Sequence, residues 1–125
     1  MCNEPNGRPH VVLIADDEKV VRQVTVAMLE REGYTILTAA SGEQAIHALE
    51  EFPGTVDLAL CDIRMPGPSG LELRSLILKQ RPETKVVLLS GDTSFNGVPA
   101  EVPTLSKPFT VEEFRKRVRL FLGIE

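Results

Sequence analysis

Three short apolar runs constrain the fold of this chain more than any other feature. They occupy residues 11–15, 58–61 and 86–89, and each is apolar at every position instead of at alternate positions. Such a run is typical of a strand covered on both faces, as in a parallel sheet packed between helices. Weaker strand patterns lie at residues 34–40 and 103–106, so we expect a sheet of five parallel strands.

Segments with the periodicity of amphipathic helices separate these strands. Apolar residues recur at helical spacing in residues 19–32, 41–49, 69–78 and 110–122. Ser41, Ser69 and Thr110 stand where an N-cap is favoured, and Gly33 is placed to end the first helix. Strands that alternate with helices predict a doubly wound α/β domain with the flavodoxin-like strand order 2-1-3-4-5.

The segment at residues 91–101 breaks this alternation. It contains Gly91, Gly97 and Pro99, and its only bulky apolar residues are Phe95 and Val98. We expect a loop or a single helical turn there, so that the fourth helix of the doubly wound fold is lost or reduced.

Composition limits the classes of protein to which the chain can belong. Its 125 residues, with 14 basic and 18 acidic side chains, fit one domain with no basic surface for direct nucleic acid binding. No apolar run approaches the ~20 residues of a membrane span, and the N-terminus is too polar for a signal peptide. Cys2 and Cys61 favour free thiols in a reducing compartment. We expect a flexible extension at residues 1–9, one domain at residues 10–123 and a cytoplasmic location.

Polar side chains follow four of the predicted strands. Asp16 and Asp17 follow the first strand, Asp62 the third, Ser90 the fourth and Lys107 the last. Ligands of parallel α/β sheets bind at the carboxyl ends of the strands. The first, third and fourth strands are neighbours in the expected order, so we expect Asp16, Asp17, Asp62 and Ser90 to share one crevice.

Three carboxylates in one crevice repel one another unless a pKa rises or a cation binds. Mg²⁺ suits such a site because it takes oxygen ligands and needs only one or two protein carboxylates. A carboxylate can also attack a phosphoryl group and form an aspartyl phosphate, provided that a metal ion and a fixed cation balance the charge. Lys107 is predicted to be that cation, and Ser90 is predicted to donate its hydroxyl to a phosphoryl oxygen.

Each of these features also has a purely structural interpretation. An Asp-Asp pair can begin a loop and cap a helix, and a lone Asp or a Lys-Pro pair commonly belongs to a turn. Cys61 is interpreted as a small buried hydrophobe instead of a redox centre. Dinucleotide binding is disfavoured, because acidic residues stand where a glycine-rich turn is needed. The carboxylate site is favoured because four separate strand ends supply compatible chemistry.

The strand-end motifs together resemble the response-regulator receiver domain, the phosphorylation module of two-component signalling. The resemblance covers residues 10–122 and rests on Asp16-Asp17-Glu18, Asp62-Ile63-Arg64-Met65-Pro66-Gly67, Ser90-Gly91 and Lys107-Pro108-Phe109. It implies Mg²⁺ as the cofactor and a sensor histidine kinase or phosphotransfer domain as the phosphoryl donor. It also implies an output protein, whose identity the sequence does not give. The motif beginning at Lys107 further resembles receivers of the hybrid histidine kinase type.

The resemblance also implies roles for individual residues. Asp62 is the expected phosphoacceptor, and Ser90 and Lys107 are expected to contact the phosphoryl group. The expected metal ligands are Asp17, Asp62 and the backbone carbonyl of Arg64, with Asp16 acting through water. A domain of this kind catalyses its own phosphorylation and dephosphorylation and is not a metabolic enzyme. A separate phosphohydrolase is disfavoured, because Arg64 stands where such an enzyme carries a second aspartate.

Two features depart from the family pattern. Thr104 stands three positions before Lys107, where receivers usually carry an aromatic switch residue coupled to the position of Ser90. The spacing from Ser90 to Lys107 is 17 residues (107 − 90), which is short for the family. The alternative function is therefore a protein-binding module of the receiver fold that switches weakly or not at all on phosphorylation.

One further hypothesis concerns the mouth of the site. Arg64 lies two residues after Asp62, and Asp92 lies two residues after Ser90. We expect Arg64 and Asp92 to pair and to slow hydrolysis by restricting the attacking water. The sequence leaves the oligomeric state open.

Overall fold

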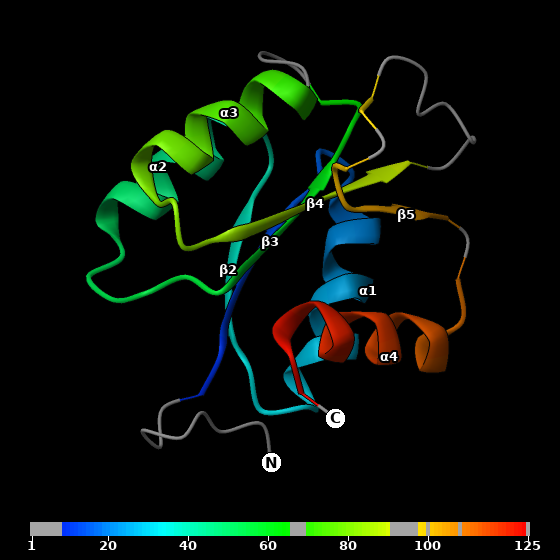
Figure 1. Cartoon of the computed structure of the whole chain (residues 1–125). Helices are drawn as coiled ribbons and strands as arrows, with labels where there is room; N and C mark the ends of the chain where they lie inside the picture. The colour runs from blue at the N-terminus through cyan, green and yellow to red at the C-terminus, as the bar shows by residue number, and fades with distance from the viewer. Residues whose placement is uncertain (1–8, 66–69, 91–97, 100, 108, 125) are drawn as a thin grey trace.

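The protein is built on a five-stranded sheet in which every pairing is parallel. The computed structural model describes residues 9–65, 70–90, 98–99, 101–107 and 109–124, and its strands lie in the order β2-β1-β3-β4-β5 (Figure 1). Their bounds are β1 (Val11–Ala15), β2 (Thr35–Ala39), β3 (Leu58–Asp62), β4 (Lys85–Ser90) and β5 (Thr104–Ser106). The predicted doubly wound fold and its strand order are confirmed.

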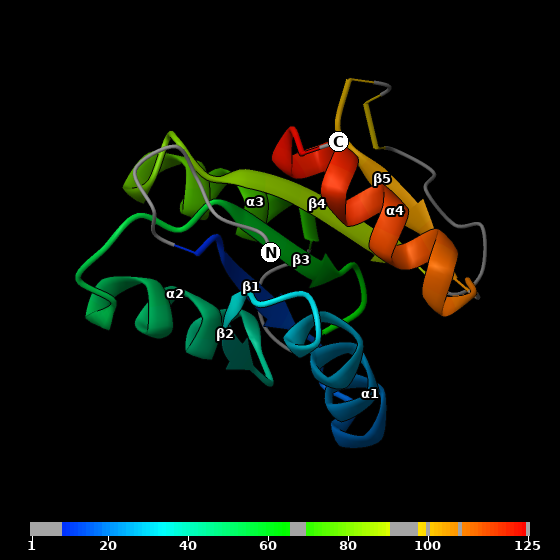
Figure 2. The same cartoon turned by 90° about the horizontal axis from the view of Figure 1, so that it is seen from below.

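Four helices cover the sheet in the described part of the chain. Their bounds are α1 (Lys19–Glu30), α2 (Gly42–Glu51), α3 (Gly70–Gln80) and α4 (Val111–Leu122). Helices α1 and α4 pack on one face of the sheet, and α2 and α3 pack on the other (Figure 1, Figure 2). None of the described helices is long and apolar enough to cross a membrane.

Successive residues of the central strands enter two separate apolar layers. Leu13 of β1 packs in the layer beneath α2 and α3, whereas Ile14 packs with Leu29 of α1 and Phe114 of α4. Leu13 and Ile14 are 0% and 1% exposed. This burial on both faces is the reason why the sequence of β1 is apolar at every position.

Two of the predicted helix starts are confirmed. The Ser41 hydroxyl accepts a hydrogen bond from the Gln44 N–H (3.1 Å) at the start of α2. Thr110 and Glu113 form a reciprocal capping box at the start of α4. The third predicted N-cap, Ser69, lies outside the described residues.

The end of α1 differs from the prediction. The helix stops at Glu30, two residues early, and the chain continues in short turns closed by Glu32 N–H to Leu29 O (3.0 Å) and Gly33 N–H to Glu30 O (3.1 Å). Gly33 follows with φ of +87°, a conformation that favours glycine. Gly33 therefore ends a turn beyond the helix instead of ending the helix itself.

The connection from β4 to β5 contains no helix among its described residues. Residues 98–99 and 101–103 are non-helical, and Val102 N–H donates to Pro99 O (3.0 Å) to close a turn. Val98 and Val102 pack against the layer beneath α2 and α3. Residues 91–97 and 100 lie outside the described part of the chain.

An arginine that the sequence did not single out holds the end of α2. Arg81 donates hydrogen bonds from its guanidinium to the backbone carbonyls of Leu49 (2.7 Å), Phe52 (2.7 Å) and Gly54 (2.7 Å). The carbonyls at the end of a helix have no partner within the helix, and the helix dipole favours a cation there. Arg81 therefore fixes the turn that leads from α2 toward β3.

Candidate functional site

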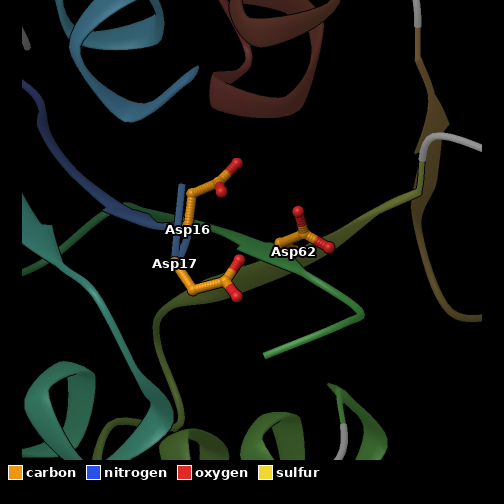
Figure 3. A group of neighbouring side chains, drawn as sticks. All are labelled: Asp16, Asp17 and Asp62. Carbon is orange, nitrogen blue, oxygen red and sulfur yellow. The ribbon is translucent and has the colours of Figure 1, made fainter. Parts of the chain in front are cut away.

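Three carboxylates converge at the carboxyl ends of β1 and β3. Asp16 and Asp17 directly follow β1, and Asp62 is the last residue of β3. Each offers one carboxylate oxygen, and these three oxygens lie within 4.8 Å of one another. Figure 3 shows the three side chains at the carboxyl ends of β1 and β3. The predicted clustering of these three carboxylates is confirmed.

The turn after β1 fixes the position of Asp16. Its backbone N–H donates to Ala39 O of β2 (3.0 Å), and its Oδ1 accepts from the Glu18 N–H (3.0 Å). The Arg22 guanidinium, one turn into α1, donates to the Asp16 carbonyl (2.7 Å). Asp16 is 2% exposed as a result, whereas its neighbour Asp17 faces solvent. The acidic pair thus presents one buried and one accessible carboxylate.

Asp62 is held by its own strand and by the turn that follows it. The Ile63 N–H donates to Leu89 O of β4 (2.8 Å), which extends the sheet pairing past Asp62. Oδ1 of Asp62 accepts a hydrogen bond from the Arg64 N–H (2.8 Å). The side chain is nearly buried, because only 9% of the residue is exposed. One oxygen is thereby fixed while the other faces the site.

Lys107 supplies the fixed cation. Its Nζ lies 3.1 Å from Oδ2 of Asp16 and 3.1 Å from Oδ2 of Asp62. Burial opposes the charged form of Lys107, but the hydrogen bond to Asp16 and the charges of Asp62 and Asp16 outweigh burial, so the pKa of Lys107 is raised above 10.5. Lys107 is therefore charged at neutral pH and bridges two strand ends.

Ser90 ends β4, the strand that lies between β3 and β5. It is 1% exposed and accepts a backbone hydrogen bond from the Lys107 N–H (2.7 Å). The sheet register places Leu89 opposite Asp62, so Ser90 comes one residue beyond the level of Asp62. Ser90 and Lys107 thus lie at the carboxyl ends of their strands, at the same end of the sheet as the carboxylates.

The residues assigned to switching and gating are less closely gathered. Thr104 is half-buried at the start of β5 and pairs in register with Leu88, two residues before Ser90. Arg64 is exposed, and its backbone contacts Asp62. Asp92 lies outside the described residues, so the expected pairing of Arg64 and Asp92 stays a prediction.

The cysteine beside Asp62 is fully buried, as predicted. Cys61 is 0% exposed and has a free thiol. Burial, together with the charge of Asp62, raises the pKa of this thiol to about 12. A thiol with so high a pKa is protonated at neutral pH and is a poor nucleophile.

Two residues that shape the site were given no role from the sequence. Arg22 anchors the turn after β1 through its hydrogen bond to the Asp16 carbonyl. Its position in the first turn of a helix that follows an acidic pair was the sequence signal that could have indicated this contact. Phe109 stacks on Phe114 with ring centres 4.7 Å apart and an angle of 11°. This stack lies two residues after Lys107 and ties the segment that carries Lys107 to the core beneath α4.

The site combines chemistry that suits a hard cation and a phosphoryl group. Three clustered carboxylates need more positive charge than one ammonium supplies, and oxygen ligands favour Mg²⁺ among common cations. Asp62 belongs to this cluster and offers a carboxylate nucleophile 3.1 Å from the Lys107 ammonium.

Comparison with known proteins agrees with this geometry. The sequence model of the family described as response regulator receiver domain matches residues 12–119. The sensor kinase CckA of Brucella abortus (strain 2308) is 34% identical over 116 residues, which cover 89% of this chain and 12% of that protein. The uncharacterized transcriptional regulatory protein YkoG of Bacillus subtilis (strain 168) is 33% identical over 121 residues, which cover 90% of this chain and 50% of that protein. The chain thus spans half or less of the length of these two relatives.

A solved structure supports the same assignment. The response regulator protein TrrA from Thermotoga maritima, in complex with Mg(2+)-BeF, superposes with a TM-score of 0.79 at 32% identity. The match covers 90% of this chain and 99% of that chain. Receiver domains of this family bind Mg²⁺ at an acidic pocket and take phosphoryl groups from histidine kinases or phosphotransfer proteins. The family match over most of the chain, together with the fold and the acidic site, shows that this chain belongs to the response regulator receiver domain family.

Proposed function

We propose that this domain accepts a phosphoryl group on Asp62 from a phosphohistidine, with Mg²⁺ bound at the acidic cluster, and signals to a partner protein. One observation carries the proposal. The Lys107 ammonium lies 3.1 Å from carboxylate oxygens of both Asp16 and Asp62, and Asp17 belongs to the same cluster. A nucleophile, a fixed cation and a place for a metal ion therefore coincide.

In the proposed transfer, a carboxylate oxygen of Asp62 attacks the phosphorus atom of the donor. An O–P bond forms as the P–N bond of the phosphohistidine breaks, and the electron pair of that bond returns to the imidazole nitrogen. Oδ1 of Asp62 is already engaged by the Arg64 N–H (2.8 Å), so we assign the attack to Oδ2, the oxygen that faces Lys107. Lys107 then neutralises an oxygen of the transferred group, and the Ser90 hydroxyl is assigned as a hydrogen-bond donor to another.

The residues of the cluster fit a magnesium ion. We assign Asp17, Asp62 and the backbone carbonyl of Arg64 as ligands, and Asp16 as a residue that acts through water. Mg²⁺ usually keeps several waters and binds only one or two carboxylates, in accord with one accessible and one nearly buried carboxylate here. When bound, the ion neutralises charge that develops on the phosphoryl oxygens.

We assign the donor to a sensor histidine kinase or a phosphotransfer domain, and we assign the receiver unit to residues 10–123, after an extension at residues 1–9. Similarity to the receiver domain of the hybrid histidine kinase CckA, at 34% identity and a TM-score of 0.71, supports a phosphorelay of the hybrid-kinase type. The buried, reduced thiol of Cys61 is consistent with the reducing environment of the cytoplasm, where we place the domain.

Thr104 supports a second candidate function, a binding module of the same fold that switches weakly or not at all. A threonine on β5 has no aromatic ring that could change place in response to Ser90. The acceptor cluster is nevertheless complete, so we favour phosphorylation.

Intact-mass spectrometry tests the proposal directly. The protein is incubated with acetyl phosphate and MgCl2, and we expect a single phosphoryl adduct that is absent from Asp62→Asn. Asp57→Asn is the matched control, because Asp57 lies at the opposite end of β3, where its Oδ2 accepts from the Val11 N–H (2.8 Å). An adduct that persists in Asp62→Asn would refute the assignment, and a parent protein that binds Mg²⁺ without forming an adduct would favour the binding module.

A further inference from the structure

The turn between β1 and α1 carries two of the three clustered carboxylates, and every polar atom of Asp16 in it has a partner. The Asp16 N–H donates to Ala39 O (3.0 Å), and its Oδ1 accepts from the Glu18 N–H (3.0 Å). Its Oδ2 accepts from the Lys107 Nζ (3.1 Å), and its carbonyl accepts from the Arg22 guanidinium at 2.7 Å, the shortest of the four contacts. A direct bond from Asp16 to a metal ion would compete with these contacts, in accord with its assigned role through water.

The hydrogen bond from Arg22 also acts on the residue after Asp16. A peptide unit is planar, so a bond that fixes the direction of the Asp16 carbonyl also fixes the plane that leads to the Cα of Asp17. Asp17 is exposed, yet its carboxylate offers an oxygen within 4.8 Å of oxygens of Asp16 and Asp62. Arg22 therefore limits where the backbone can place the Asp17 carboxylate.

The stability of α1 does not account for an arginine at this position. The Arg22 N–H donates to the carbonyl of the N-cap residue Glu18 (2.9 Å), so Arg22 lies one turn into the helix. The positive end of the helix dipole disfavours a cation there. Glu18 makes no side-chain capping bond and no acidic residue lies in the first turn, all of which the structure describes. The contact with the Asp16 carbonyl is thus the interaction that Arg22 gains at this site.

The charge of Arg22, taken alone, acts against a bound cation. Its guanidinium bonds the backbone of a residue whose carboxylate belongs to the cluster, so a positive charge lies near the site. Like charges repel, so removal of this charge alone would strengthen the binding of Mg²⁺. Loss of the hydrogen bond that holds the turn would weaken it. The sign of the change in affinity therefore separates the two roles.

We propose that Arg22 is a positioning residue of the magnesium site: its hydrogen bond to the Asp16 carbonyl holds the peptide that presents the Asp17 carboxylate, and so raises the affinity for Mg²⁺. The proposal rests on the proposed function, since it requires that Mg²⁺ binds at the acidic cluster. Arg22 contacts neither the ion nor the phosphoryl group and acts through Asp16 and Asp17. Loss of a residue that orients metal ligands commonly weakens metal binding by about 10–100-fold.

Isothermal titration calorimetry of the metal-free protein with MgCl2 tests this proposal. We expect the Kd for Mg²⁺ to rise about tenfold in Arg22→Met. Arg22→Lys keeps the charge and one donor, so its Kd should lie between those of the parent and Arg22→Met. Arg31→Met removes an exposed arginine at the opposite end of α1 and should change the Kd by less than about twofold. If Arg22→Met fails to fold, the weaker binding of Arg22→Lys still decides the question.

Two further measurements separate positioning from other roles. In the metal-free protein, the Glu18 N–H should exchange faster in Arg22→Met than in the parent, because its acceptor Asp16 is less firmly held. The amide of Met28, near the other end of α1, should be unchanged. Phosphorylation by acetyl phosphate should be slow in Arg22→Met at low MgCl2 and should reach the parent rate at saturating MgCl2, because Arg22 acts on metal binding and not on the transfer.

Four outcomes would overturn the proposal. A Kd equal to that of the parent, with a lower urea midpoint, would assign Arg22 to the stability of α1 alone. A lower Kd in Arg22→Met would show that only its charge acts on the ion. Adduct formation that stays slow at saturating MgCl2 would place Arg22 in the transfer step. A parent that shows no saturable binding of Mg²⁺ would overturn the proposed function as well, whereas the first three outcomes leave that function intact.

Discussion

Lys107→Met removes the ammonium that bridges Asp16 and Asp62 while keeping much of the apolar stem. Each ion pair at 3.1 Å corresponds to about 5 kcal/mol of Coulomb energy at an effective dielectric constant of about 20, much of which offsets desolvation. Removal of one partner of a buried pair costs about 3–5 kcal/mol. Because 19% of the Lys107 side chain is exposed and the carboxylates can take up water, we expect a smaller loss, about 2 kcal/mol in metal-free solution. At this chain length the loss corresponds to a fall in Tm of roughly 8 °C.

Urea unfolding with and without saturating MgCl2 measures this effect. Mg²⁺ and the Lys107 ammonium balance the same carboxylates, so Mg²⁺ should stabilise the variant by at least about 1 kcal/mol more than it stabilises the parent. Lys79→Met, at an exposed position of α3, is the matched control and should change stability by no more than about 0.5 kcal/mol. The reasoning is refuted if Lys107→Met is as stable as the parent without Mg²⁺, or if it gains no more from Mg²⁺ than the parent does.

Three further predictions concern the core and the ion pair. Arg81→Ala leaves the carbonyls of Leu49, Phe52 and Gly54, in the last turn of α2 and the loop after it, without their cationic donor. The free energy of unfolding should therefore fall by about 2 kcal/mol, and Arg81→Lys should recover part of this loss. Equal urea midpoints for the three proteins would contradict this role. In a Cys2→Ser background, Cys61 should react with a disulfide reagent at pH 8 only as fast as local unfolding exposes it, because its thiol is buried and has a pKa of about 12. A reaction rate equal to that of a free thiol would contradict the burial. The pKa of Lys107 is higher in the folded state than its ordinary value of 10.5, so its stabilising contribution is complete below pH 10.5 and is lost as pH rises through the folded pKa. The difference in stability between the parent and Lys107→Met should therefore shrink above pH 10.5. A difference that stays constant there would contradict the assignment.

The central sheet was predictable because burial on both faces leaves a pattern that few other structures produce. The runs that form β1, β3 and β4 are apolar at every position, and the structure places successive side chains in opposite layers. The N-caps Ser41 and Thr110 were predictable because the capping bond depends on residues only three positions apart. Local chemistry and burial therefore determined most of the fold.

The remaining features depend on contacts between residues distant in sequence. Arg81 donates to carbonyls as many as 32 positions away, and no local pattern marks that contact. The early end of α1 depends on two short turns before Gly33, and a glycine one turn later gives almost the same sequence signal as a glycine at the helix end. Lys107 was predicted to be the cation that balances the carboxylates, because the carboxyl ends of parallel strands lie at the same end of a sheet. Its ion pair with Asp16, 91 positions away in the sequence, was not predicted.

The central claim is that Asp62 itself becomes phosphorylated, and chemical trapping of the acyl phosphate tests it most directly. The protein is phosphorylated with acetyl phosphate and MgCl2, reduced with borohydride, digested with trypsin and sequenced by tandem mass spectrometry. The tryptic peptide of residues 32–64 contains both Asp57 and Asp62, so fragment ions distinguish the two positions. We predict homoserine at position 62 and unmodified aspartate at position 57. Homoserine at Asp16, Asp17 or Asp57 with an unmodified Asp62, or no homoserine in a protein that binds Mg²⁺, would contradict the account.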